Sequence, residues 1–156
     1  MAEAIQVESD VARTYDLLGG EKTIREPIRN VLEAHDVLAK GLPAASLFHL
    51  AKVVGFRASD DALSKSIGIS LRTLQRLRSA DKKKLLSVEQ SSRTWRFAEI
   101  FGHAIDVMGS RDEAESWMSQ PAIGLSNRKP IELLHTSAGA EAVEEYLTRL
   151  EYGVYA

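Results

Sequence analysis

The sequence predicts an all-α protein, and three observations lead to that prediction. Apolar side chains recur every three to four residues in most segments, which is the period of a helix buried on one face. No segment alternates apolar and polar residues convincingly, as a half-buried strand would. Helix caps and glycines fall where the periodic segments begin and end. The 156 residues suit one domain or two small ones.

Two helices are expected in the N-terminal part. The first spans about 9–18 and stops at Gly19-Gly20, because paired glycines interrupt a helix. The second spans about 25–40, where Pro27 is tolerated in the first turn, which needs no amide donor. Four apolar residues are expected to form its inward stripe: Ile28, Val31, Leu32 and Leu38.

Residues 41–80 carry the most specific local pattern. After a break at Gly41-Leu-Pro43, a helix is expected at about 44–54. Gly68 then stands where a tight turn between two helices favours a positive φ, and Ser70 is placed to cap the second helix. The inward and outward positions fit a helix-turn-helix at about 60–80: Leu63, Ile67, Ile69, Leu74 and Leu77 face inward, and Arg72, Thr73, Gln75, Arg76 and Ser79 face outward.

Charge is distributed unevenly around this motif. Residues 52–84 hold nine Lys or Arg against three acidic residues, a net charge of +6, whereas residues 1–51 and 85–156 carry −3 and −5. A basic patch attracts phosphate and releases counterions, which supplies most sequence-independent affinity for DNA. The pattern indicates DNA binding, and the alternative is a helical hairpin whose arginines are only solvated.

The basic residues of this region suggest different roles on DNA. Arg72 and Arg76 lie four apart on one face, so both can enter the major groove, where Arg commonly reads guanine; either could instead hold phosphate. Arg78 is expected to contact phosphate or a partner within the chain. The run Lys82, Lys83 and Lys84 is expected to clamp phosphate without reading sequence, or else to form a solubilising loop.

The C-terminal half is expected to contain one long helix. Ser87-Val-Glu-Gln90 is a capping box that opens it, and its apolar residues occupy more than one side of the span 88–108. We therefore expect a central core helix or a dimer contact. The remaining elements are a helix at about 111–119 opened by a capping box at Ser110-Arg-Asp-Glu113, a loop at 120–130, a brief helix through Leu134 and a final helix at about 138–151.

Composition excludes several classes of protein. Without cysteine the chain has no disulfide, thiolate metal site or cysteine nucleophile. No apolar run approaches the ~20 residues of a membrane helix, and the acidic N-terminus lacks signal-peptide features, so we expect a cytoplasmic protein. The histidines lack metal-ligand spacing, and His103 and Asp106 are expected to share only a structural hydrogen bond. We predict a protein that is not an enzyme and holds no metal or cofactor.

Several residues of the second half resemble those of a known family. They are Trp117-Met118, Pro121, Leu125, Lys129-Pro130, Glu132-Leu133-Leu134, Gly139, Val143, Leu147 and Gly153. The string Ser70-Leu-Arg-Thr-Leu-Gln-Arg76 is also similar to an S-x-R-T-L-x-R motif in that family's helix-turn-helix. Over residues 41–156 the chain resembles the Xre/MbcA/ParS-type antitoxins, which combine an Xre/Cro-like helix-turn-helix with a small helical toxin-binding domain.

The resemblance implies the antitoxin of a type II toxin–antitoxin system. Such a protein neutralises a RES-domain toxin that degrades NAD, with its C-terminal end at the mouth of the toxin's active site, and represses its own operator DNA. The residues implied to read DNA are Ser70, Arg72, Thr73, Gln75 and Arg76. Toxin blocking is implied for the last helix and tail, with Glu144, Glu145, Glu151, Tyr152, Tyr155 and Ala156.

The chemistry of the tail agrees with that role. A pocket that holds the pyrophosphate of NAD should be lined by basic groups, with which the glutamates and the terminal carboxylate could pair. Tyr152 and Tyr155 add rigid amphipathic bulk of the kind enriched in interface hot spots. The alternative is that Glu144 and Glu145 form a solvated helix face and that Tyr152 closes the domain's own core.

We therefore expect three parts in the chain: N-terminal helices at 1–40, a helix-turn-helix and dimerisation region at 41–108, and a toxin-binding domain at 109–156. Symmetric operators match two-fold symmetric proteins, so a homodimer within a larger toxin–antitoxin complex is expected. Two other functions stay open. One is a transcriptional regulator with a small-molecule pocket under the long helix, and the other is a scaffold or partition-type adaptor whose helix-turn-helix is vestigial.

Overall fold

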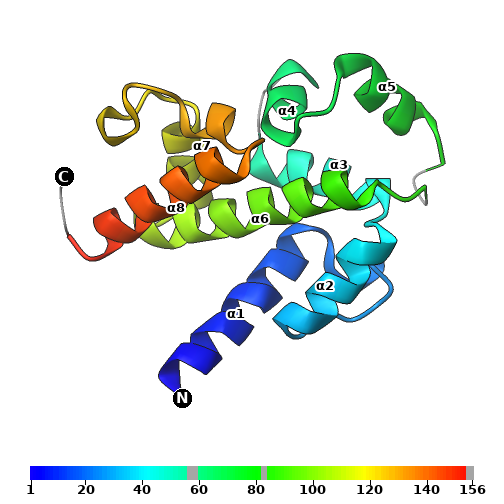
Figure 1. The fold of residues 1–156 in the computed structure, drawn as a ribbon, viewed down its shortest axis with the longest axis horizontal. Helices are drawn as coiled ribbons and strands as arrows, with labels where there is room; N and C mark the ends of the chain where they lie inside the picture. Colours follow the sequence, from blue (N-terminus) through cyan, green and yellow to red (C-terminus); the bar gives the residue numbers. More distant parts are fainter. Residues whose placement is uncertain (56–59, 82–83, 154–156) are drawn as a thin grey trace.

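The computed structural model describes residues 1–55, 60–81 and 84–153. Within these residues the chain is helical, and the only strand-like pairings are two isolated bridges, Pro43 with Leu85 and Ala122 with Arg128. Figure 1 shows the shorter helices arranged around one long helix. The all-α prediction is confirmed.

In chain order the elements are α1 (Ala2–Leu17), the 3-10 turn η1 (Gly20–Lys22), α2 (Val31–Lys40), α3 (Ala44–Val54), α4 (Asp60–Ile67), α5 (Leu71–Ser79), α6 (Val88–Met108), α7 (Arg111–Met118), the 3-10 turns η2 (Ile123–Leu125) and η3 (Pro130–Leu133), and α8 (Ser137–Glu151). None of the described helices is long and apolar enough to cross a membrane.

Helix α6 lies at the centre of the molecule. It begins at the predicted capping box, in which the Gln90 amide donates to the Ser87 hydroxyl and the Ser87 amide donates to the Gln90 side chain. These bonds satisfy amides that have no partner in the first turn of a helix. The helices α1, α2, α3, α4, α7 and α8 all contact α6. Its position explains why its sequence is apolar on more than one side.

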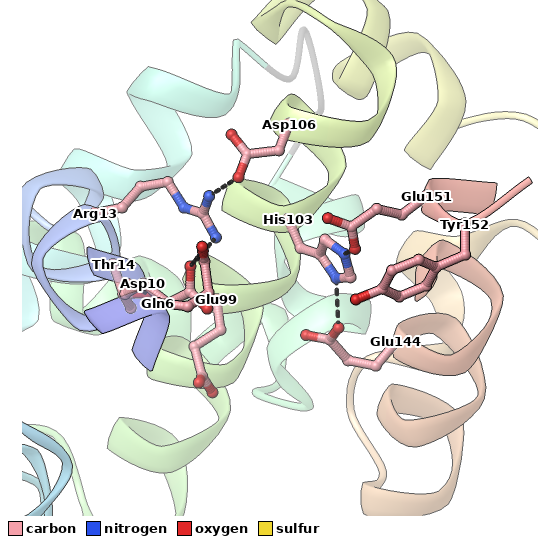
Figure 2. Close-up of a pocket in the computed structure, with 10 residues that line it drawn as sticks. All are labelled: Gln6, Asp10, Arg13, Thr14, Glu99, His103, Asp106, Glu144, Glu151 and Tyr152. Atoms are coloured by element: carbon pink, nitrogen blue, oxygen red, sulfur yellow. Dashed lines mark hydrogen bonds and ion pairs between the residues drawn. The ribbon is translucent and has the colours of Figure 1, made fainter. Parts of the chain in front are cut away.

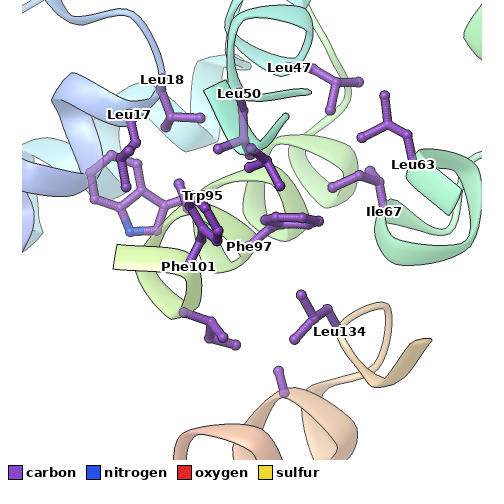
Figure 3. Packing of buried hydrophobic residues seen from close by; sticks show 14 of the residues in the cluster. Leu17, Leu18, Leu47, Leu50, Leu63, Ile67, Trp95, Phe97, Phe101 and Leu134 are labelled. Carbon is purple, nitrogen blue, oxygen red and sulfur yellow. The ribbon is translucent and has the colours of Figure 1, made fainter. Parts of the chain in front are cut away.

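The hydrophobic core forms around two phenylalanines of α6. Phe97 and Phe101 are fully buried, and Figure 3 shows them between Leu50 of α3 on one side and Leu134 on the other, with Ile67 of α4 beside Phe97. These partners come from both halves of the chain. The helix-turn-helix and the C-terminal helices therefore share one core.

The wide apolar arc of α6 is covered within a single chain. Ile100 and Ala104 lie on one face of the helix and Trp95 lies on a different one, and all three are buried by neighbouring elements. The structure thus supports a central core helix, which is one of the two predicted alternatives. Because these apolar side chains are already buried within the chain, they are no evidence that α6 forms a dimer contact.

The first helix is longer than predicted. It begins at Ala2 rather than near residue 9, and residues 2–9 are exposed. These first two turns bury no apolar stripe, so the sequence shows no helical periodicity there from which the extension could be predicted. Further along, Val11 and Leu18 are buried, and the Tyr15 hydroxyl donates to the Ile24 carbonyl at 2.8 Å.

The second helix is shorter than predicted. It begins at Val31 rather than near residue 25, because Pro27 disfavours a helical conformation for the residue before it. Asn30 then caps the helix, and its side chain accepts a hydrogen bond from the Glu33 amide at 2.9 Å. The cap therefore lies several residues after the proline.

The prediction that Val31 and Leu32 face inward is wrong. They are 57% and 76% exposed, and the buried positions of α2 are Ala34 and Val37. Ile28 is buried as predicted, although it lies before the helix. The later start of the helix changes which of its residues meet the core.

We expect Phe101→Ala to lower the free energy of unfolding by about 3–5 kcal/mol, because it removes a fully buried ring. Denaturant unfolding followed by circular dichroism measures this loss. Val88→Ala is the control on the same helix, since Val88 is 55% exposed, and should change the free energy by less than about 0.5 kcal/mol. Equal losses for the two variants would contradict the position of Phe101 in the core.

Candidate functional site

The helix-turn-helix has the geometry that its sequence predicts. α4 ends at Ile67, and Gly68 takes a φ of +71°, which side chains rarely adopt. Ser70 then caps α5, because its side chain accepts a hydrogen bond from the Thr73 amide at 3.2 Å. All five predicted inward residues are buried: Leu63, Ile67, Ile69, Leu74 and Leu77.

The outer face of α5 is polar, basic and exposed. Arg72, Gln75 and Arg76 are exposed, and within the described ranges neither arginine forms an ion pair. Both guanidinium groups are therefore available to an outside partner, and their spacing puts them on one helical face. The Ser70 hydroxyl donates to the Thr73 hydroxyl at 2.9 Å, so these two residues also fix the start of the helix.

Arg78 is used inside the protein. Its guanidinium pairs with Asp60 at 2.5 Å and lies 4.5 Å from the ring centroid of Phe48. These contacts tie the end of α5 to the start of α4 and to α3. Of the two roles expected for Arg78, the structure supports the partner within the chain.

The lysine run beside α5 is described only in part. Lys82 and Lys83 lie outside the described residues. Lys84 is exposed, and its carbonyl accepts a hydrogen bond from the Ala44 amide at 2.8 Å, at the start of α3. The phosphate clamp therefore stays a prediction.

The turn of the motif rests on the central helix. Arg93 of α6 donates to the carbonyls of Ile67 and Gly68 at 3.3 and 3.4 Å, and it pairs with Glu89 at 2.6 Å. At the same place α4 contacts η3 of the C-terminal region. The orientation of α5 is thus set by α6 as well as by the short turn.

Helix α8 carries three of the six residues predicted to bind a partner protein, Glu144, Glu145 and Glu151. It begins after Thr136, whose side chain accepts a hydrogen bond from the Gly139 amide at 3.0 Å. A Cβ on Gly139 would lie 2.0 Å from the Leu133 carbonyl oxygen, so a side chain there would push η3 away. Val143 and Leu147 are fully buried on the side of α8 that packs on α6.

Two of the predicted partner-binding glutamates, Glu144 and Glu151, form contacts within the protein. His103 of α6 contacts Glu144 through Nδ1 at 2.7 Å and Glu151 through Nε2 at 3.0 Å (Figure 2). The glutamates are seven residues apart, which places them on one face of α8, two turns from each other. With a carboxylate at each ring nitrogen, His103 favours the imidazolium form, in which both nitrogens donate.

The electrostatics of this contact follow from its geometry. The hydrogen bond to Glu144 raises the pKa of His103 above its usual value, the bond to Glu151 adds to the rise, and burial of the ring opposes it. The charged pair fastens the end of α8 to α6. Glu144 and Glu151 therefore already have a partner within the chain.

The predicted hydrogen bond between His103 and Asp106 is wrong. Asp106 instead pairs with Arg13 of α1, which also pairs with Asp10 at 3.4 Å. His103 and Asp106 are neighbours on α6, yet each side chain reaches a different helix (Figure 2). Sequence spacing reports which residues share a face, and it cannot tell which neighbouring helix that face meets.

A polar cavity of about 300 Å³ lies between α1, α6 and α8, beside these contacts. Five carboxylates line it: Asp10, Glu99, Asp106, Glu144 and Glu151. The pKa of Glu99 is raised because burial of its carboxylate outweighs the opposing effect of Arg96, which lies 3.6 Å away. Among the residues that the structure describes, no group of His, Cys, Asp and Glu could hold a metal ion.

Two of the other predicted partner-binding residues, Glu145 and Tyr152, face solvent. Glu145 is exposed, and Tyr152 is 75% exposed. The alternative in which Tyr152 closes the core is therefore wrong. Tyr155 and Ala156 lie outside the described residues. An acidic side chain in the second half of α8 and an aromatic side chain just after its end thus face outward.

The positioning roles of His103 and Arg93 were not predicted from the sequence. His103 reaches glutamates 41 and 48 residues away, and Arg93 reaches carbonyls 25 and 26 residues away. The one available signal was the pair Glu144 and Glu151 on a single face of the last helix.

Comparisons with known proteins agree on both halves of the chain. The family model described as the antitoxin Xre-like helix-turn-helix domain matches residues 33–99. The model described as the antitoxin Xre/MbcA/ParS C-terminal toxin-binding domain matches residues 103–153. Together they span residues 33–153 apart from 100–102, from within α2 to the end of α8.

Individual relatives carry the same name. An Antitoxin Xre of Yersinia enterocolitica is 38% identical over 92 residues, which are 58% of this chain and 61% of the relative. An Antitoxin Xre of Photorhabdus laumondii is 29% identical over 134 residues, or 85% of this chain and 88% of the relative. A chain in the crystal structure of the M. tuberculosis MbcT-MbcA toxin–antitoxin complex superposes with a TM-score of 0.50 at 19% identity, covering 72% of this chain and 96% of that one. This last likeness shows the fold.

The stabilisation by His103 should depend on pH. The pKa of His103 is raised above the usual 6.5 in the folded protein. The stabilisation is therefore fully present below the pKa that His103 has in the unfolded chain, and it is lost as the pH rises through the pKa of His103 in the folded protein. We expect the free energy of unfolding to fall more steeply above about pH 6.5 in the wild type than in His103→Gln, which does not titrate. Urea unfolding at several pH values measures both slopes. Identical slopes would contradict the charged pair.

Proposed function

Because the chain belongs to the Xre antitoxin family, we propose that it neutralises a RES-domain toxin that degrades NAD and represses its own operator. Members of this family are binding and regulatory proteins rather than enzymes. The observation that carries the proposal is the placement of two exposed faces. α5 and the end of α8 lie toward opposite ends of the molecule, with α6 between them (Figure 1). One chain can therefore hold DNA and a protein partner at the same time.

Neutralisation is assigned to the end of α8 and the tail. His103 holds Glu144 and Glu151, so these two glutamates orient the helix, while Glu145 and Tyr152 face the toxin. Carboxylates of this end, together with Tyr155 and Ala156 of the tail, would occupy the basic pocket that binds the pyrophosphate of NAD. A helix end that is already fixed loses little conformational freedom on binding.

Operator binding is assigned to the outer face of α5. Arg72, Gln75 and Arg76 would reach base edges in the major groove, because their side chains are exposed and without ion pairs among the described residues. Ser70 and Thr73 lie at the helix start, where hydroxyls and backbone amides commonly bind phosphate. The lysines that follow α5 would add sequence-independent affinity.

A homodimer is part of the proposal because operators are commonly two-fold symmetric. Two copies of α5 would enter major grooves about one helical turn, or ~34 Å, apart. Since the apolar arc of α6 is covered within one chain, we assign the dimer contact to no face of that helix.

Two alternative functions fit the structure less well. A small-molecule regulator needs a largely apolar pocket of roughly 300–1,000 Å³. The cavity between α1, α6 and α8 has about 300 Å³ and is lined mostly by charged side chains. A second cavity, of about 730 Å³ between α6 and the start of α8, is also lined mainly by polar and charged side chains. A helix-turn-helix that no longer binds DNA would not require two exposed arginines, Arg72 and Arg76, on one face of a helix that Ser70 caps.

Arg76→Ala should weaken operator binding by ~1–3 kcal/mol if Arg76 reads a base, and the loss should vary with the base pair placed opposite it. Gel shifts against the upstream region and its single-base variants measure this. Arg111→Ala is the matched control, because Arg111 is an exposed arginine outside the motif, and should leave binding unchanged. An equal loss on every DNA sequence would make Arg76 a phosphate contact.

Deleting residues 152–156 should leave folding and operator binding nearly intact and release the toxicity of the partner. Co-expression of the truncated chain with the toxin measures protection, and thermal melting and gel shifts report on the rest of the protein. Glu141→Ala, an exposed change at the other end of α8, is the control and should protect fully. If the truncated chain still protects cells, the tail does not block the active site.

A further inference from the structure

Residues 122–128 form a closed loop between α7 and η3. The Ala122 amide donates to the Arg128 carbonyl at 3.1 Å, and the Leu125 and Asn127 amides both donate to the Ala122 carbonyl, at 3.0 and 2.9 Å. Three backbone hydrogen bonds across so few residues leave the loop little freedom to change shape. The side chains of this loop are therefore presented in fixed directions.

The loop is also held by the helices beneath it. Gly124 lies flat against the Tyr146 ring of α8, since a Cβ there would come within 2.2 Å of Tyr146 Cε2. That ring stacks on Trp117 of α7, with centroids 6.1 Å apart and an interplanar angle of 23°. Ser126 and Asn127 have φ values of 56° and 60°, a left-handed conformation that is uncommon outside glycine, although asparagine adopts it more readily than serine.

This rigid loop points an isoleucine into solvent. Ala122 and Leu125 are buried on either side of it, whereas Ile123 is 88% exposed. A single exposed isoleucine needs no partner by itself. What distinguishes Ile123 is the closed loop that holds it outward, at a turn where polar residues are usual. An apolar side chain that is already ordered binds at low entropic cost.

The loop stands on the same side of the molecule as the end of α8 (Figure 1). η2 contacts α8 directly, and Tyr146, which supports Gly124, lies six residues before Tyr152. Six residues of helix span ~9 Å. A standard protein interface covers about 800 Å² on each partner, so one partner can cover the tail and the loop together.

The charge around Ile123 differs from that of its surroundings. Arg128 and Lys129 at the base of the loop are both exposed, and in the described part of the chain neither forms an ion pair. Residues 85–156 as a whole carry a net charge of −5. A complementary surface would have an apolar socket for Ile123 with acidic groups at its rim.

We propose that Ile123 is a second anchor for the RES-domain toxin, seated in an acid-rimmed apolar socket outside the toxin's active site. The inference rests on the proposed function and adds to it. The tail occupies the active site, while the 122–128 loop fixes the orientation of α8 on the toxin and contributes to the choice of the matching toxin. Unlike the tail, the 122–128 loop does not take the place of a substrate; it recognises the shape and charge of the toxin surface.

Ile123→Asp in the full chain tests the proposal. The affinity for the purified RES-domain toxin, measured by calorimetry, should fall by about tenfold or more, because the variant would bury a charge in an apolar socket. Ile123→Leu should bind within about threefold of the wild type, since its volume and polarity are conserved. Leu32→Asp is the matched control on α2, where Leu32 is 76% exposed, and should not change the affinity. Operator binding and thermal melting should be unchanged in all three variants.

The outcomes separate this inference from the function on which it rests. If the wild type binds the toxin and Ile123→Asp binds equally well, the loop is no anchor and the antitoxin function stands. If Leu32→Asp weakens binding as much as Ile123→Asp, the effect is a general one of added charge, and the socket is wrong. If the wild type binds no RES-domain toxin at all, both proposals fall.

Discussion

The burial of helix α6 on nearly every side is the constraint on which the rest of the structure depends. A helix whose apolar side chains point in several directions is stable only when other elements cover it all round. Phe97 and Phe101 bring the N-terminal helices, the helix-turn-helix and the C-terminal helices into one core. Each functional face then takes its orientation from the same helix, through Arg93 at one end and His103 at the other.

This arrangement gives the two proposed interfaces a common rigid base without letting them overlap. The turn before α5 is held by a guanidinium from α6, and the last turns of α8 are held by an imidazole from the same helix. The charged residues that hold each face in place are therefore distinct from those left exposed on it. Arg93 and His103 position the interfaces, while Arg76 and Tyr152 remain open to partners.

The elements with strong local signals were predictable from the sequence. Gly68, Ser70 and the Ser87 capping box are local devices, and each has the predicted geometry. The start of α2 was predicted too early, because Pro27 was assigned to the first turn of the helix, whereas the helix begins only after its cap at Asn30. Contacts across helices, such as those of His103 with the two glutamates, depend on the angle at which helices pack, and periodicity within one segment does not contain that angle.

If one rigid chain presents DNA-binding and toxin-binding faces at separate ends, hydrogen–deuterium exchange on the full chain should show a separate protected region for each partner. Amide exchange would be compared for the free protein, the protein with operator DNA and the protein with the RES-domain toxin. DNA should protect α5 and the turn before it, whereas the toxin should protect the end of α8 and residues 122–128. Toxin protection centred on α5, with α8 unchanged, would contradict this separation of the two faces.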